Sequence, residues 1–126
     1  MKVHAIDINL IDDINKSARS VHPDEFLCTL TEKDGVISEM VLLPGTVYGD
    51  EHSFLNMWMA PNNIHIVGTA HSHPDYCNEA SDEDLQFFSN MGGYHIITCM
   101  PYDRSSWKIY DCNGEEADLE IVNCIF

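Results

Sequence analysis

Residues 64–84 of the chain, IHIVGTAHSHPDYCNEASDED, join an apolar run, a polar loop and an acidic segment. The run 64–71 predicts a central strand, and Pro74 ends it because proline donates no hydrogen bond to a sheet ladder. Residues 82–90 predict a helix that Gly92-Gly93 closes at its C-terminus. The apolar side expected for that helix consists of Leu85, Phe88 and Met91. We expect the chemistry of the protein where this strand ends and this helix begins.

Four side chains of this stretch have the spacing of a metal site. Residues two apart on a strand face the same side, so His71 and His73 present both imidazoles to one point. Ser81 stands three residues before Asp84, which is the spacing of a capping box at a helix start. The positive end of the helix dipole favours an ionised carboxylate at Asp84. Two histidines and one carboxylate with an open fourth position are the ligand set of a catalytic zinc.

The rest of the chain predicts a mixed α/β fold. Leu10, Ile14 and Val21 recur at helical spacing after a cap at Asp7 or Asn9, and this helix ends at His22-Pro23. The other strands expected are 26–30 and 36–43, joined by a turn at Asp34-Gly35, and then 53–59, 95–99, 107–110 and 119–122. No linker or repeat divides the sequence. We therefore expect a single domain over residues 1–126, with a largely antiparallel, curved sheet flanked by two main helices.

The charge of the chain excludes some partners. The sequence has 126 residues with 21 acidic and 6 basic side chains, and its formal net charge is −15. Because 44% of the residues are hydrophobic, the chain is expected to fold despite this charge. Binding to nucleic acid or to anionic membranes is not expected, since both need clustered Lys and Arg. No basic residue lies between Lys33 and Arg104, so this region either faces a cationic partner or is adapted to high salt.

Targeting signals and cysteine patterns indicate a cytoplasmic protein. The first residues contain no apolar run of signal-peptide length, and no stretch of 18 uncharged apolar residues occurs. The odd number of cysteines and the absence of CxxC spacing argue against a disulfide scaffold and a cysteine zinc site. A bridge between Cys77 and Cys99 would brace the loop between the two histidines and Ser81, but a reducing cytosol favours free thiols. The histidines interpreted as structural are His4, His22, His52, His65 and His95.

The arrangement His71-Ser72-His73, seven residues, Ser81, two residues, Asp84 resembles the signature of the JAMM (MPN-plus) zinc metalloprotease family. The chain is most similar to the short, stand-alone archaeal members. The family has a glutamate upstream, and Glu25 stands in that place, directly before the predicted strand 26–30. The resemblance implies a cytidine-deaminase-like JAMM/MPN architecture and one zinc ion per chain. The roles it implies are zinc ligands at His71, His73 and Asp84, a general acid/base at Glu25 and an oxyanion donor at Ser81.

The resemblance also implies a substrate class. Members of the family cut the bond after the Gly-Gly tail of ubiquitin-like proteins, which in archaea are small archaeal modifier proteins joined to target lysines. Glu25 would take a proton from the attacking water and deliver it to the departing amine. The apolar segment 54–59 borders the substrate groove or, in the interpretation we prefer, lies in the core. Two alternatives stay open: a processing protease that trims the tail of a ubiquitin-like sulfur-carrier protein, and a non-catalytic MPN-type binding module.

Overall fold

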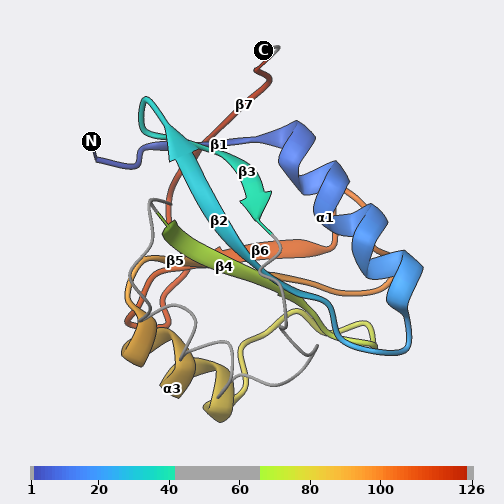
Figure 1. The fold of residues 1–126 in the computed structure, drawn as a ribbon. Helices are drawn as coiled ribbons and strands as arrows, with labels where there is room; N and C mark the ends of the chain where they lie inside the picture. Colours follow the sequence, from blue (N-terminus) through green and yellow to red (C-terminus); the bar gives the residue numbers. More distant parts are fainter. Residues whose placement is uncertain (1, 42–65, 125–126) are drawn as a thin grey trace.

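The computed structural model describes residues 2–41 and 66–124 (Figure 1). Along the chain, the helices and strands are β1 (Ala5–Asp7), α1 (Ile8–Val21), β2 (Leu27–Lys33), β3 (Val36–Val41), β4 (Ile66–Ser72), α3 (Asp82–Met91), β5 (Tyr94–Thr98), β6 (Trp107–Tyr110) and β7 (Glu120–Val122). In this part of the chain, no helix is both long enough and apolar enough to cross a membrane.

The strands form one curled sheet in the order β6-β5-β4-β2-β3-β1-β7, which confirms the mixed α/β class. The pairs β2–β3, β2–β4 and β5–β6 are antiparallel, and the pairs β4–β5, β1–β3 and β1–β7 are parallel. The sheet therefore contains more parallel pairing than the sequence led us to expect. β4 and β5 pair in parallel because α3 connects them, and strands joined through a crossover helix run in the same direction.

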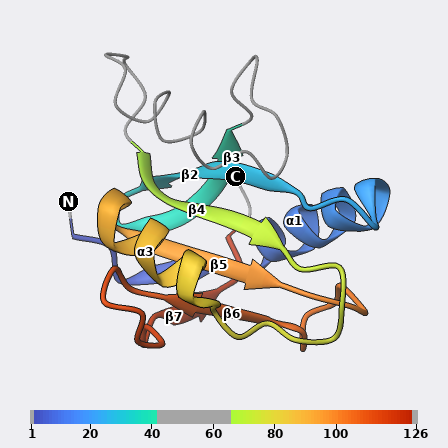
Figure 2. The same ribbon diagram turned by 90° about the horizontal axis from the view of Figure 1, so that it is seen from below.

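The two helices pack on opposite faces of the sheet (Figures 1 and 2). The face under α1 carries the larger core, in which Leu10, Ile11 and Ile14 of the helix meet Leu30 of β2 and Ile96 of β5. The face under α3 carries a smaller core built from Leu27, Phe87, Phe88, Met91, Ile97 and Tyr110. Since successive strand residues alternate between faces, β2 and β5 supply residues to both cores.

Most of the predicted elements are present with bounds shifted by a few residues. Helix α1 begins after an N-cap at Asp7, whose carboxylate accepts a hydrogen bond from Asn9 N at 2.9 Å, and it is capped at its other end by His22. The hairpin β2–β3 turns at Asp34-Gly35, and both residues have positive φ. The prediction missed β1, which has only three residues. The predicted strand 53–59 and the residues of the apolar segment within it lie outside the described residues.

The prediction for the buried side of α3 was wrong at Leu85. This side chain is 37% exposed, whereas Asp84, Phe87, Phe88 and Met91 are buried. These four positions have the i, i+3, i+4, i+7 spacing of one helix face, so the helix is rotated until a carboxylate faces the sheet. The rotation follows from contacts of Asp84 described below.

His95 fastens the C-terminus of α3 to the sheet. Its ring is fully buried and stacks on Phe88 with a centroid distance of 4.4 Å. Nε2–H donates to the carbonyl of the C-cap Gly92 at 2.6 Å, and Nδ1 accepts from the Thr69 hydroxyl, also at 2.6 Å. Burial lowers the pKa of His95 from 6.5 to about 4, although the hydrogen bond to Gly92 opposes this shift. The fold therefore holds His95 as a neutral imidazole, in agreement with its interpretation as a structural histidine.

The buried neutral imidazole predicts a specific loss of stability in mild acid. Between pH 6.5 and about pH 4, His95 binds a proton in the unfolded chain but not in the folded one, so falling pH favours unfolding in this range. At pH 5 this difference amounts to about 2 kcal/mol. We expect the stability gap between the parent and a His95→Gln variant, measured by urea denaturation, to narrow by that amount from pH 7 to pH 5. A gap that does not change with pH would contradict this account of His95.

Candidate metal centre

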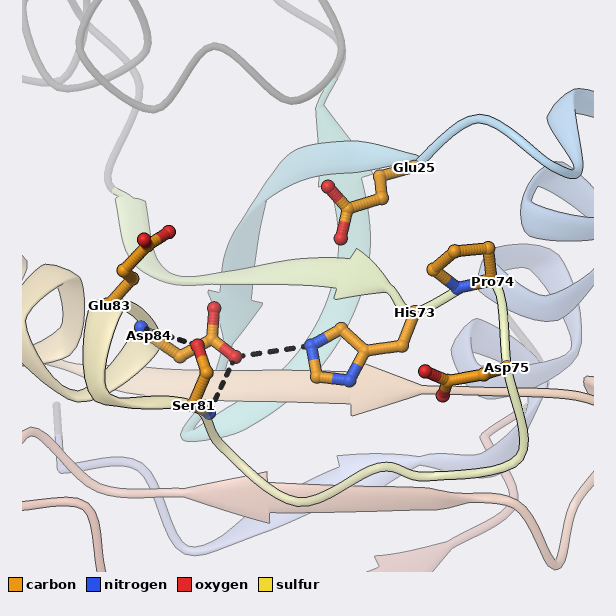
Figure 3. Close-up of a pocket in the computed structure, with 7 residues that line it drawn as sticks. All are labelled: Glu25, His73, Pro74, Asp75, Ser81, Glu83 and Asp84. Carbon is orange, nitrogen blue, oxygen red and sulfur yellow. Dashed lines mark hydrogen bonds and ion pairs between the residues drawn. The ribbon is translucent and has the colours of Figure 1, made fainter.

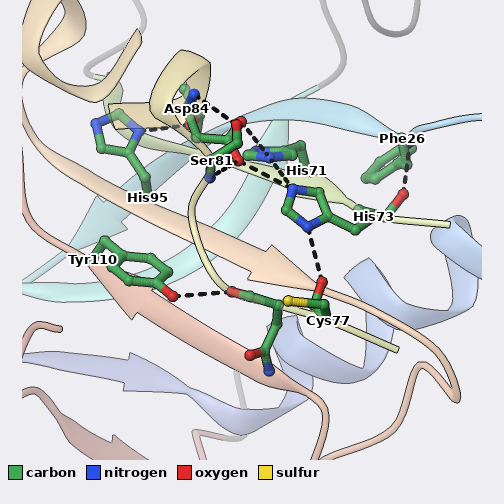
Figure 4. A network of polar contacts seen from close by, with 11 residues as sticks. Phe26, His71, His73, Cys77, Ser81, Asp84, His95 and Tyr110 are labelled. Carbon is green, nitrogen blue, oxygen red and sulfur yellow. Dashed lines mark hydrogen bonds and ion pairs between the residues drawn. The ribbon is translucent and has the colours of Figure 1, made fainter. Parts of the chain in front are cut away.

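The end of β4 and the first turn of α3 bring three side chains together (Figure 4). His71 lies within β4 and His73 directly after it, and their Nε2 atoms are 3.3 Å apart. Asp84 Oδ1 lies 3.2 Å from His71 Nε2, and Asp84 Oδ2 lies 3.1 Å from His73 Nε2. His71 and Asp84 are buried, and His73 is partly buried. The structure thus brings together the three residues predicted as ligands.

A capping box fixes Asp84 in this position. Ser81 Oγ accepts a hydrogen bond from Asp84 N at 3.1 Å, and Asp84 Oδ2 accepts one from Ser81 N at 3.0 Å. Burial alone would raise the pKa of the Asp84 carboxyl, but hydrogen bonds from His71 and His73 outweigh it and hold that pKa well below the usual range. Asp84 is therefore ionised, and its position is set by the start of α3 and by both imidazoles.

The three donor groups fit a metal ion. Among the described residues, they form a group whose ligand atoms all lie within 4.8 Å of one another. Two ligands placed about 2.0–2.1 Å from a zinc ion at a tetrahedral angle are about 3.3 Å apart, close to the separations of 3.1–3.3 Å seen here. His73 Nδ1–H donates to the carbonyl of Cys77 at 2.9 Å, so a metal ion would take the Nε2 position, where the proton now shared with Asp84 lies.

His71 is oriented differently from His73. Its Nδ1 atom is buried and has no hydrogen-bond partner among the described residues. Its ring instead packs against His73, with a centroid distance of 5.1 Å, and against Phe88 of α3, with a centroid distance of 6.4 Å. Packing against the helix that carries Asp84 therefore sets the direction of the His71 imidazole.

A cleft of about 370 Å³ opens onto this group of side chains. Its lining comprises Glu25, His73, Pro74, Asp75, Ser81, Glu83 and Asp84 (Figure 3). Glu25 comes from the segment between α1 and β2, and its carboxylate points into the cleft (Figure 3). Ser81 borders the same cleft beside Asp84. All five residues that the sequence singled out for chemistry therefore lie at one place, on three separate parts of the chain.

Sequence reasoning gave no role to Ser72, the residue between the two histidines. Its side chain is fully buried and points away from them, and its Oγ accepts a hydrogen bond from Phe26 N at 2.8 Å. In return, Ser72 N donates to the carbonyl of Phe26 at 3.0 Å. This pair of bonds ties the residue after Glu25 to the middle of the two-histidine segment. The feature of the sequence that could have indicated this role is a small hydroxyl side chain at the end of a strand predicted to be buried.

The cysteines do not enter the group of ligand atoms found among the described residues. Cys77 is exposed and Cys99 buried, and the structure holds both as free thiols. Cys77 contributes only its backbone carbonyl, which orients His73.

Comparison with known proteins places this geometry in context. Residues 8–110 match a family described as prokaryotic homologs of the JAB domain. A probable metalloprotease of Haloferax volcanii is 30% identical over 132 residues, which cover 97% of this chain and 81% of that protein.

Solved structures show the same fold. A JAB1/MPN domain protein from Archaeoglobus fulgidus is 39% identical, with a TM-score of 0.77 over 94% of this chain and 99% of its own. A second structure, described as JAMM, a metalloprotease-like zinc site in the proteasome and signalosome, is 37% identical, with a TM-score of 0.76 over 97% of this chain and 100% of its own.

The convergence of the three donors predicts tight metal binding that depends on them. We expect the parent protein to retain about one Zn²⁺ per chain after dialysis, and Asp84→Asn and His73→Ala to retain much less, because each removes one of the three ligands. His4→Ala is the matched control, since His4 is exposed and bonds to the Asp34 carbonyl. The measurement is metal content by mass spectrometry, with circular dichroism to check the fold. Equal zinc content in all four proteins would contradict the assignment of the ligands.

Proposed function

This chain belongs to the family of prokaryotic homologs of the JAB domain, and we propose that it is a zinc-dependent isopeptidase. Its substrate would be a ubiquitin-like modifier protein joined through its C-terminal Gly-Gly to a lysine side chain of a target protein. The observation that carries the proposal is the convergence of His71, His73 and Asp84 on one point at a cleft that also contains Glu25. A non-catalytic binding module has no need of such a constellation.

Each proposed role follows from the chemistry of the residue and its place in the cleft. Zn²⁺ held by His71, His73 and Asp84 would lower the pKa of a bound water toward neutrality and polarise a substrate carbonyl. Glu25 is exposed and lies on the opposite side of the cleft from Ser81 (Figure 3), so its carboxylate is placed to accept the proton of the attacking water. The same carboxyl then delivers this proton to the departing lysine amine.

Ser81 is proposed to stabilise the oxyanion that develops on the substrate carbonyl. Its Oγ accepts the Asp84 amide with one lone pair, and the hydroxyl hydrogen is left to donate. Such a donor acts best when it is already oriented before the reaction, because no reorganisation is then needed in the transition state. The capping box supplies that orientation, so one residue serves both the helix start and the proposed chemistry.

The role of Glu25 predicts loss of turnover without loss of metal. Removing a general base slows a reaction by about 100- to 10,000-fold, so we expect Glu25→Gln to lower kcat by at least about 100-fold on a modifier conjugate. Zinc content should stay the same, because Glu25 is not one of the three grouped ligands. Glu39→Gln on the exposed side of β3 is the matched control.

Glu83 provides the rival assignment, since it also lines the cleft. If Glu83→Gln abolishes cleavage while Glu25→Gln retains the parental rate, the proposed mechanism is wrong and the base belongs to Glu83.

The substrate class is tested by offering two forms of the same modifier. One carries an isopeptide bond from its terminal glycine to a lysine side chain, and the other carries a linear extension after Gly-Gly. We expect release of free modifier from the isopeptide conjugate, followed by mass, with loss of activity in EDTA and recovery on adding Zn²⁺. Cleavage of the linear form alone would favour the processing protease. Cleavage of neither form by zinc-loaded protein would overturn the proposed function.

A further inference from the structure

Tyr102 lies in the loop between β5 and β6. It does not line the cleft, but it connects two segments that border the cleft. The side chain is buried, with 3% of its surface exposed. Its hydroxyl donates to the carbonyl of His73 at 3.1 Å and lies 2.9 Å from Nδ1 of His22. Because the hydroxyl has a single hydrogen, which His73 receives, His22 must carry a proton on Nδ1 and donate to Tyr102.

The hydrogen bonds that the Tyr102 hydroxyl makes with His73 and His22 form a bridge between the proposed metal ligands and the segment of the proposed base. His73 is one of the three grouped ligands. His22 caps α1, and only Pro23 and Asp24 separate it from Glu25. The rings of His22 and Tyr102 also meet edge to face, with centroids 5.7 Å apart. The bridge therefore joins the segment that carries the proposed base to the backbone of a ligand.

Glu25 is held from its other side as well. Phe26 exchanges two hydrogen bonds with Ser72, as described above, so the residue after Glu25 is tied to the same two-histidine segment. Glu25 itself is exposed. Its position relative to the three grouped ligands thus depends on hydrogen bonds on both sides of it, from the His22 side chain and from the Phe26 backbone.

The loop that carries Tyr102 is itself anchored. The Arg19 guanidinium of α1 donates to the Tyr102 carbonyl, and Asn15 Nδ2, also of α1, donates to the carbonyl of Asp103 at 2.9 Å. Met100 N donates to the carbonyl of Asp75 at 2.8 Å. These hydrogen bonds fix the backbone that carries Tyr102. Its hydroxyl can therefore hold two other segments at a constant separation.

We infer that Tyr102 is a positioning residue, whose hydroxyl sets the place of Glu25 relative to the ligand His73. The inference rests on the proposed function, because it assigns Tyr102 a part in the same hydrolysis. Displacing a reacting group by a fraction of an ångström slows a reaction without weakening substrate binding. Tyr102→Phe removes the hydroxyl and keeps the ring that packs against the core.

The test compares Tyr102→Phe with Tyr94→Phe in the zinc-loaded protein. Tyr94 lies at the start of β5, whereas His71 and His73 lie at the other end of the parallel pair β4–β5. We expect Tyr102→Phe to lower kcat on the isopeptide conjugate by about 10-fold, with KM and zinc content within about 2-fold of the parent. Tyr94→Phe should leave kcat within about 2-fold.

A second readout does not depend on cleavage. Hydrogen exchange of the peptide covering residues 22–27 should be faster in Tyr102→Phe than in the parent and unchanged in Tyr94→Phe. If the parent protein cleaves nothing, the proposed function fails, and this exchange experiment still decides whether the bridge holds the Glu25 segment. Unchanged exchange and unchanged kcat in Tyr102→Phe would overturn the inference, and so would a rise in KM alone.

His22→Ala keeps the inference testable if Tyr102→Phe proves unstable, because the His22 ring is on the surface. This variant removes the donor to Tyr102 and should reproduce the fall in kcat. The double variant should fall no further than the more affected single variant, since both substitutions break the same bridge. If the double variant instead lowers kcat by the product of the two single effects, the inference is overturned.

Discussion

The carboxylate of Asp84 must satisfy three partners at once, and the geometry of the site depends on this constraint. It accepts the amide of Ser81 and lies against Nε2 of both His71 and His73. Because the two imidazoles lie at the end of β4, Asp84 takes a place in the buried stripe of α3, and this orientation of the helix leaves Leu85 exposed. The buried His95 then fastens the far end of the same helix. The packing of α3 on the sheet and the placement of Asp84 beside the two imidazoles therefore depend on each other.

The other half of the site is held by hydrogen bonds of the residues on either side of Glu25. Glu25 follows α1 and comes to the cleft because the residues around it are bonded to the two-histidine segment, at Phe26 through Ser72 and at His22 through Tyr102. Among the described residues Glu25 takes part in no ion pair, so its exposed carboxylate can move a proton without first breaking one. This division suits the proposed hydrolysis: of the proposed ligands, His71 and Asp84 are buried and His73 is partly buried, whereas the proposed base stays accessible to water and substrate.

The parts of the site that the sequence predicted obey local rules. The two-residue spacing of His71 and His73 and the three-residue spacing of Ser81 and Asp84 determine which way these groups point, whatever the rest of the fold does. The role of Tyr102 was not predictable in this way, because its partners His22 and His73 are 80 and 29 residues away in sequence. Strand β1 was missed because three residues show no period, and its partners in β3 and β7 are equally remote. The family resemblance, rather than any spacing rule, distinguished Glu25 from the other glutamates.

In the proposed site, two imidazoles and one carboxylate, with no thiolate, hold the metal. The most direct test is the X-ray absorption spectrum of the zinc-loaded protein at the zinc edge. We expect the zinc to be surrounded by nitrogen and oxygen atoms at about 2.0 Å, including two imidazoles with their characteristic outer-shell scattering. A sulfur scatterer at about 2.3 Å would place a cysteine on the metal and contradict the account. A first shell with no imidazole would contradict it equally.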